Sequence, residues 1–244
     1  MPPAWTPATI AGKPADVFTP PAPPRFAVIY LHPVGGETLA DNPAYTAALA
    51  EHGLACVAPW GARSWWADRV CPEFDPRLTA ERHLLDNVVP WARDHWNLGA
   101  SPVGVCGISM GGQGAVRLGF KHPDRFPVVA SVAGAFEYHR RYGQGSPIDD
   151  MYDSPEQCRQ DTAILHVNPF KAPPAIWFAC DPDDDEWFAG NDRLHEKLTA
   201  LGVPHTADLT TRAGGHSWAY FDAMAGPMLG FVAAALDRQS RRLV

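Results

Sequence analysis

Short apolar runs rich in valine, isoleucine and alanine recur along this 244-residue chain, and each is followed by a polar turn and a segment of helical periodicity. This alternation predicts an α/β fold with a mostly parallel central sheet and helices on both faces. Residues 8–18 are predicted to add a hairpin strand at the sheet edge, since the proline-rich link 20–24 is too stiff for a helix. The predicted parallel strands are 26–31, 54–58, 102–106, 127–132, 174–180 and 205–209.

The composition favours one domain over residues 1–244, because 46% hydrophobic residues suffice for an α/β core that needs no disulfide or metal. The formal net charge of −7 leaves no excess of basic residues to neutralise a phosphate backbone or an anionic lipid surface. Neither a nucleic acid nor a membrane is therefore expected as a partner. The composition does not predict an oligomeric state.

The five cysteines are odd in number and widely spaced, which favours reduced, buried thiols over disulfides. Residues 1–7 lack the basic and apolar regions of a secretory leader, and no later stretch approaches the roughly 20 apolar residues of a membrane span. We therefore expect a soluble cytoplasmic protein.

A G-x-S-x-G motif covers residues 107–111. It follows the predicted strand 102–106 and precedes a predicted helix over 113–121, the context in which this motif forms the nucleophile elbow of an α/β-hydrolase. The elbow exposes the Ser109 hydroxyl and puts the Met110 amide at a helix N-terminus, where it can donate to an oxyanion. The alternative is a phosphate-binding loop, but no lysine follows these glycines as a Walker motif requires. We predict that Ser109 is a nucleophile.

A serine nucleophile needs a histidine base, which an acid holds in one tautomer. In this fold the acid and then the histidine follow the serine along the chain. Three histidines lie in the appropriate region: His195 within a predicted helix, His205 at the start of a predicted strand, and His216 in a glycine-rich loop after the last strand. We predict His216 as the base, because only that loop can carry an imidazole over the carboxyl end of the sheet.

The orienting acid is expected after strand 174–180, where spacing alone does not select one residue. The candidates are Asp181, Asp183, Asp184, Asp185 and Glu186. Three of these aspartates also fit the opening of a calcium loop, but that loop requires glycine at its sixth position and glutamate at its twelfth. The chain has Glu186 and Asp192 there, so no metal is predicted.

Several segments resemble one esterase family of the α/β-hydrolase superfamily. That family includes esterase D (S-formylglutathione hydrolase), feruloyl-type esterases and mycolyltransferases of the antigen 85 type. The resemblance extends from about Tyr30 to Phe231. The segments that carry it are 109–115, 122–126, the acidic turn, and 214–218.

The resemblance implies two further parts of the site. The family's orienting aspartate typically comes directly before a residue that an aromatic one follows, which fits Asp185 best and Asp184 second. The family also has an oxyanion donor within His-Gly-x-Gly-Gly after the first central strand. Here residues 32–36 read His-Pro-Val-Gly-Gly, and because Pro33 has no amide to donate, the resemblance implies the Val34 amide, with the Gly35 amide as the alternative.

The loop after the second parallel strand carries aromatic and basic residues on the side of the sheet where ligands bind in this fold. Trp65, Trp66 and Arg69 are predicted to border the substrate pocket. Alternatively, the tryptophans fix the loop to the core and the arginine pairs with a nearby acid. Residues 135–165 are expected to form a small cap.

These features together predict a serine carboxylic-ester hydrolase that acts through an acyl-enzyme on a small or medium acyl ester or thioester. No cofactor is expected, and the predicted partner is the small-molecule substrate alone. Two alternatives share the scaffold, namely an acyltransferase with the same triad and an inactive hydrolase-fold binding protein.

Overall fold

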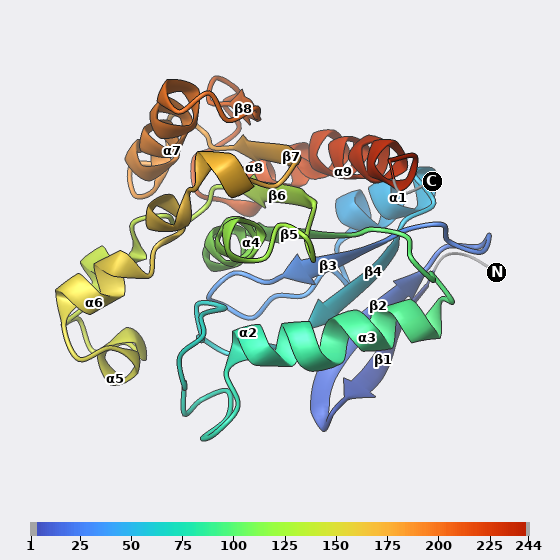
Figure 1. Cartoon of the computed structure of the whole chain (residues 1–244), viewed down its shortest axis with the longest axis horizontal. Helices are drawn as coiled ribbons and strands as arrows, with labels where there is room; N and C mark the ends of the chain where they lie inside the picture. The colour runs from blue at the N-terminus through green and yellow to red at the C-terminus, as the bar shows by residue number, and fades with distance from the viewer. Residues whose placement is uncertain (1–3, 243–244) are drawn as a thin grey trace.

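The computed structural model describes residues 4–242, which form an eight-stranded sheet with helices on both faces (Figure 1). The strand order is β1-β2-β4-β3-β5-β6-β7-β8. The strands are β1 (Ala4–Ile10), β2 (Lys13–Thr19), β3 (Ala27–Leu31), β4 (Ala55–Pro59), β5 (Val103–Ile108), β6 (Val128–Val132), β7 (Ala175–Ala179) and β8 (Thr206–Asp208).

The predicted α/β-hydrolase architecture is confirmed, with β3 to β8 at the six predicted parallel positions. The expected edge segment is a complete hairpin, in which β1 pairs antiparallel with β2, and β2 pairs antiparallel with β4. All pairs from β4 to β8 in the strand order are parallel. The carboxyl ends of β3 to β8 therefore lie at one edge of the sheet, where such folds bind ligands.

Two layers of helices cover the sheet. The helices α1 (Pro43–Glu51), α8 (Trp218–Ala223) and α9 (Ala225–Ser240) cover one face. The other face is covered by α2 (Ala80–His83), the π-helical turn η1 (Leu84–Val88), α3 (Val89–His95), α4 (Met110–Lys121) and α7 (Phe188–Ala200).

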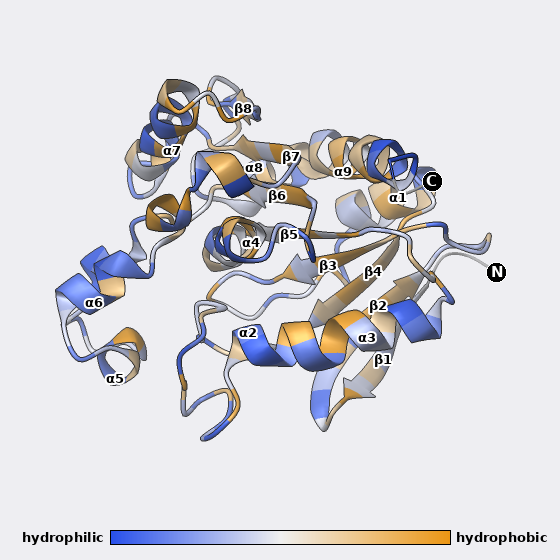
Figure 2. Cartoon of the chain, viewed as in Figure 1, coloured by the Kyte–Doolittle hydropathy of each residue, from blue (hydrophilic) through white to orange (hydrophobic). Residues whose placement is uncertain are grey.

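The core consists of two apolar clusters, one on each face of the sheet. Along β3, Ala27, Ile29 and Leu31 belong to one cluster, whereas Val28 and Tyr30 belong to the other. Successive strand side chains point to opposite faces, so a strand with both faces covered must be apolar throughout. Figure 2 shows the resulting hydrophobic strands at the centre of the molecule. All five cysteines are buried free thiols, as predicted.

Short helices between β6 and β7 lie beside the sheet at the left of Figure 1. They fall mostly in the region 135–165 where a cap was expected. These elements are η2 (Tyr138–Arg141), α5 (Ile148–Met151), α6 (Pro155–Gln160), η3 (Ala163–His166) and η4 (Pro169–Lys171).

A buried ionic network joins α4 to α2 and to this helical segment. Arg117 is 1% exposed and pairs with both Glu81 and Asp161. Lys121 and His122 each lie 2.8 Å from a Glu81 carboxylate oxygen. Burial alone raises the pKa of Glu81, but the hydrogen bond with His122 and the charges of Arg117 and Lys121 lower it to about 2. The network therefore fixes the helix that follows Ser109.

No helix among residues 4–242 is both long enough and apolar enough to cross a bilayer.

Candidate active site

Ser109 lies at the sharp turn between β5 and α4, with φ of 53° and ψ of −115°. A non-glycine residue with positive φ is strained, and such strain is typical of a nucleophile elbow. The glycines on either side permit the turn, because a Cβ on Gly107 would overlap Gly111, and one on Gly111 would overlap the carbonyl of Leu31. Met110 follows as the first residue of α4.

His216 reaches Ser109 from the loop between β8 and α8. Its Nε2 lies 3.0 Å from the Ser109 Oγ, and its Nδ1 lies 2.7 Å from Oδ2 of Asp184. The loop bends at Gly214 and Gly215, whose φ values are 102° and 67°. These conformations favour glycine, and a Cβ on Gly215 would also come too close to the backbone of residue 183.

The Asp184 carboxylate is 1% exposed and hydrogen-bonded at both oxygens. Its Oδ1 accepts from the Trp187 amide at 2.9 Å and from the Glu186 amide at 3.2 Å. Its Oδ2 accepts from His216 and, at 3.6 Å, from the thiol of Cys180. A carboxylate fixed in this way holds the proton of the imidazole on Nδ1, which leaves Nε2 free to accept from the serine.

The expectation that Asp185 orients His216 is wrong, because the carboxylate at His216 belongs to Asp184. Asp185 is exposed and lies one position further along the turn. The physical reason is a local Asx turn: the side chain of Asp184 folds over the amides two and three residues ahead, so it points inward while the next side chain points to solvent. The sequence signal for Asp184 is its position two and three residues before the last amides of the turn that precedes α7, which is the spacing of an Asx turn.

Asp181 has a different task in the same acidic turn. Its Oδ2 accepts from the amides of Ala213 and Gly215, and its Oδ1 accepts from the amide of Asp183. These hydrogen bonds fix the histidine loop to the turn that carries Asp184. Among residues 4–242 there is no group of three or more histidine, cysteine, aspartate or glutamate residues that could hold a metal ion.

His32 fixes the segment that carries the expected oxyanion donor Val34. The Nε2 of His32 accepts from the Gly61 amide at 2.9 Å, so the ring proton lies on Nδ1, which donates to the Pro33 carbonyl at 2.7 Å. The Gly36 amide donates to the same carbonyl at 3.0 Å. Because the carbonyl and the next N–H point in opposite directions in a planar peptide, fixing the Pro33 carbonyl also fixes the Val34 amide. Burial lowers the pKa of His32.

Ser109 and His216 open into a cavity of about 290 Å³. Two indole side chains, those of Trp65 and Trp187, give it apolar walls. Its lining residues are Val34, Arg63, Trp65, Ser109, Arg141, Gln144, Ser146, Pro147, Glu186, Trp187 and His216.

Of the three predicted pocket residues, only Trp65 lines this cavity. Trp66 is fully buried and packs edge-on against His32, with ring centroids 5.0 Å apart. The Arg69 guanidinium lies 5.3 Å from the ring centroid of Tyr152, away from the cavity. The expectation for Trp66 and Arg69 is therefore wrong, and the alternative, in which the tryptophan fixes the loop to the core, describes Trp66.

The sequence did not single out two cavity residues that the fold brings in from other loops. Arg141 comes from η2 and forms an ion pair with Glu186. Trp187 ends the acidic turn, and the Arg141 guanidinium carbon lies over its indole, 5.8 Å from the ring centroid. Both segments flank the active-site edge of the sheet only in the folded chain, so no local pattern marked them.

The fold, the strained serine turn and the Ser109–His216–Asp184 hydrogen-bond chain define a protein of the α/β-hydrolase class. Residues 45–231 match the model of the family described as Putative esterase, and the chain belongs to this family.

Solved structures with the same fold include S-formylglutathione hydrolase from Agrobacterium tumefaciens, with a TM-score of 0.78 and 17% identity over 92% of this chain and 90% of that one. A ferulic acid esterase superposes with a TM-score of 0.75 and 17% identity over 95% and 98% of the two chains. Fluorophosphonate-binding serine hydrolase F of Staphylococcus aureus gives a TM-score of 0.76 and 17% identity, over 96% of this chain and 99% of that chain.

Among curated proteins, esterase Rv1288 of Mycobacterium tuberculosis is 25% identical over 192 residues, which cover 67% of this chain and 41% of that protein. The chain thus corresponds to less than half the length of this relative.

Proposed function

We propose that this protein is a serine carboxylic-ester hydrolase with Ser109 as nucleophile, His216 as general base and Asp184 as the orienting acid. The observation that carries the proposal is the continuous hydrogen-bond chain, with 3.0 Å between Ser109 Oγ and His216 Nε2 and 2.7 Å between His216 Nδ1 and Asp184 Oδ2. Membership of the esterase family supports the same reaction class.

In the proposed reaction Ser109 Oγ attacks the ester carbonyl carbon while its proton moves to His216 Nε2. The carbonyl oxygen becomes an oxyanion, which the amides of Met110 and Val34 stabilise. Collapse of the tetrahedral intermediate breaks the bond to the alcohol or thiol, which leaves with the proton from His216. Water then attacks the acyl-enzyme by the same route and restores Ser109.

The cavity supports a small or medium acyl ester or thioester as substrate. Its volume of about 290 Å³ lies just below the usual range for ligand sites, and Trp65 and Trp187 give it apolar walls. Trp65 stacks on Tyr138 at a centroid distance of 4.7 Å, so this wall is rigid. The helical segment between β6 and β7 supplies Arg141 and Ser146 to the cavity wall, so we assign it as a small cap. The cap and the sheet then form a single domain over residues 1–244.

The proposal is tested by incubating the protein with a fluorophosphonate and locating the adduct by peptide mass spectrometry. We expect one adduct, at Ser109, that Ser109→Ala abolishes and His216→Ala nearly abolishes. Ser146→Ala is the matched control, because Ser146 lines the same cavity but lies outside the hydrogen-bond chain. The absence of an adduct in folded wild-type protein would instead identify an inactive binding scaffold, and an adduct elsewhere would refute the assignment of Ser109.

A further inference from the structure

A second and larger cavity, of about 600 Å³, lies at the end of the sheet where the parallel strands begin. Its wall includes Pro102, Pro127 and Pro174, each the residue before the first residue of β5, β6 or β7. Ser109 follows the other end of β5, and the six residues of that strand separate the two ends by roughly 20 Å. This cavity is therefore distinct from the candidate active site.

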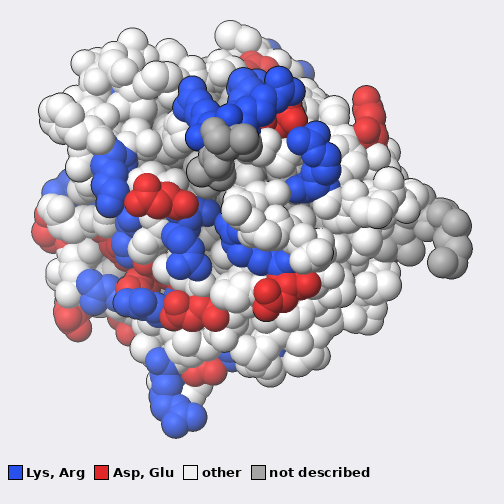
Figure 3. Space-filling model, turned by 45° about the vertical axis from the view of Figure 1, so that its right-hand side comes forward, with Lys and Arg blue, Asp and Glu red and all other residues white. Residues whose placement is uncertain are grey.

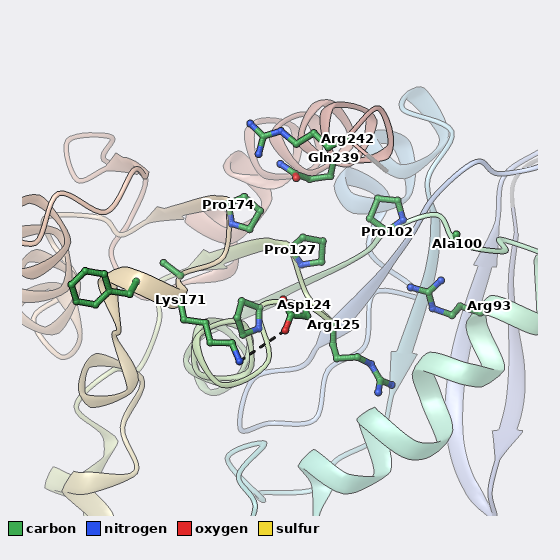
Figure 4. A pocket seen from close by; sticks show the side chains of 13 residues that line it. Arg93, Ala100, Pro102, Asp124, Arg125, Pro127, Lys171, Pro174, Gln239 and Arg242 are labelled. Carbon is green, nitrogen blue, oxygen red and sulfur yellow. Dashed lines mark ion pairs between the residues drawn. The ribbon is translucent and has the colours of Figure 1, made fainter. Parts of the chain in front are cut away.

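The lining of this cavity is strongly cationic although the chain has a net charge of −7. Arg93, Arg125, Lys171 and Arg242 line it, and the only acidic side chain among its lining residues is that of Asp124. Figure 4 shows these side chains around the cavity, from α3, the loop after α4, η4 and the turn after α9. Lysine and arginine also form several patches on the side of the molecule shown in Figure 3.

The acidic side chain does not neutralise the group. Asp124 is 88% exposed, and its Oδ2 lies 4.0 Å from the Lys171 ammonium. Within residues 4–242, the three arginines form no ion pair. A surface with several cationic groups and so few acidic partners attracts anions.

Two of the arginines are also held in position by the backbone. Arg93 Nη1 donates to the Gly99 carbonyl at 2.7 Å, and Arg125 Nη2 donates to the Leu85 carbonyl at 2.8 Å. Since a guanidinium has five N–H donors, most of each fork remains available to a ligand. Partial burial and the charge of Arg125 lower the pKa of Arg93. An anion between these two like charges would relieve their repulsion.

We propose that this cavity binds a compact, multiply charged anion that carries phosphate groups. Guanidinium forks match phosphate oxygens in a bidentate geometry, and an ammonium group adds a point charge. Several cations around one cavity suit two phosphate groups better than a single carboxylate. Four prolines among the lining residues, the three at the strand starts and Pro123, give the cavity rigid walls, so it is formed before the ligand binds.

Isothermal titration calorimetry with inorganic pyrophosphate, in magnesium-free buffer of low ionic strength, tests the proposal. We expect one site per chain, binding that is tighter than that of orthophosphate, and an affinity that falls with added salt. Arg93→Gln and Arg125→Gln should each weaken binding by about tenfold, as expected for the loss of a charge-assisted hydrogen bond. Arg238→Gln is the matched control, because it removes one exposed arginine of α9 that does not line the cavity.

Lys171→Gln and Arg242→Gln keep the test valid if loss of a backbone contact unfolds an Arg93 or Arg125 variant. Absence of one-to-one binding, or equal weakening by Arg238→Gln, would overturn the proposal. The proposal would also be overturned if the protein bound vesicles that contain phosphatidic acid but not pyrophosphate, because a flat lipid surface does not enter the cavity. Ser109→Ala should bind pyrophosphate as wild type does, so this result does not depend on the proposed hydrolase activity.

Discussion

The assignment of the orienting acid can be tested with two neighbouring substitutions, Asp184→Asn and Asp185→Asn. In Asp184→Asn the amide oxygen can still accept from the Trp187 and Glu186 amides, so the turn should keep its shape. The amide nitrogen then faces His216 Nδ1 and donates to it. This interaction requires an unprotonated Nδ1, which places the ring proton on Nε2, the atom that must accept the serine proton.

The expected size of the effect follows from this change of tautomer. In serine hydrolases the equivalent substitution lowers kcat by about 10⁴-fold, or about 5.4 kcal/mol of transition-state stabilisation. Asp185 is exposed and its side chain forms no hydrogen bond with any of residues 4–242, so Asp185→Asn removes the same charge at the next position without changing the imidazole. We expect its kcat to remain within about twofold of wild type, as is usual for surface substitutions away from special features.

Hydrolysis of p-nitrophenyl acetate measures kcat and KM for both variants, and the rate of fluorophosphonate labelling measures activation of Ser109 without a chosen substrate. Thermal unfolding confirms that both variants are folded. A large loss in Asp185→Asn with little loss in Asp184→Asn would refute the assignment of Asp184. Equal, small losses in both would show that His216 needs no orienting carboxylate.

Three further predictions concern the residues that support the site. Arg117→Met should lower the free energy of unfolding by about 3–5 kcal/mol in urea denaturation, because it leaves the Glu81 carboxylate buried with fewer partners. The pKa of Glu81 is lowered to about 2 from its usual 4.5, so its stabilising effect is complete above pH 4.5 and is lost as the pH falls toward 2. Glu81→Gln should therefore reduce the dependence of stability on pH in this range, and an unchanged acid transition would contradict this. His32→Phe should lower kcat by about 10- to 100-fold and raise KM less, because the Pro33 carbonyl and Val34 amide are no longer fixed. A rise in KM of that size with unchanged kcat would argue against an oxyanion role.

Sequence reasoning succeeded where the determining interactions are local. The apolar runs identify buried parallel strands, because a strand covered on both faces has no polar side. The motif around Ser109 and the glycines before His216 require particular backbone conformations over a few residues, and the sequence shows them directly. The structure brings these two residues together as their order along the chain predicted.

The choice between Asp184 and Asp185 depended on finer geometry. The pattern of acidic and aromatic residues around position 185 matched the family, but a pattern match does not reveal which way a side chain points. The direction is set by the hydrogen bonds from Asp184 to the amides of Glu186 and Trp187, which place one carboxylate inside and its neighbour outside. A shift by one residue in a turn therefore exchanges a buried acid for an exposed one.

The two cavities illustrate the part that local patterns cannot provide. Trp65 and Trp66 are adjacent and chemically identical and share a φ of 53°, yet one lines the site and the other packs on His32. The cationic cavity joins Arg93 and Arg242, which lie in α3 and after α9 and share no motif. The net negative charge argued against nucleic acids and anionic membranes as partners. Only the fold determines where the smaller number of lysine and arginine side chains come together. A chain with net negative charge can therefore still present one site for a compact anion, and the pyrophosphate titration examines this consequence of the topology.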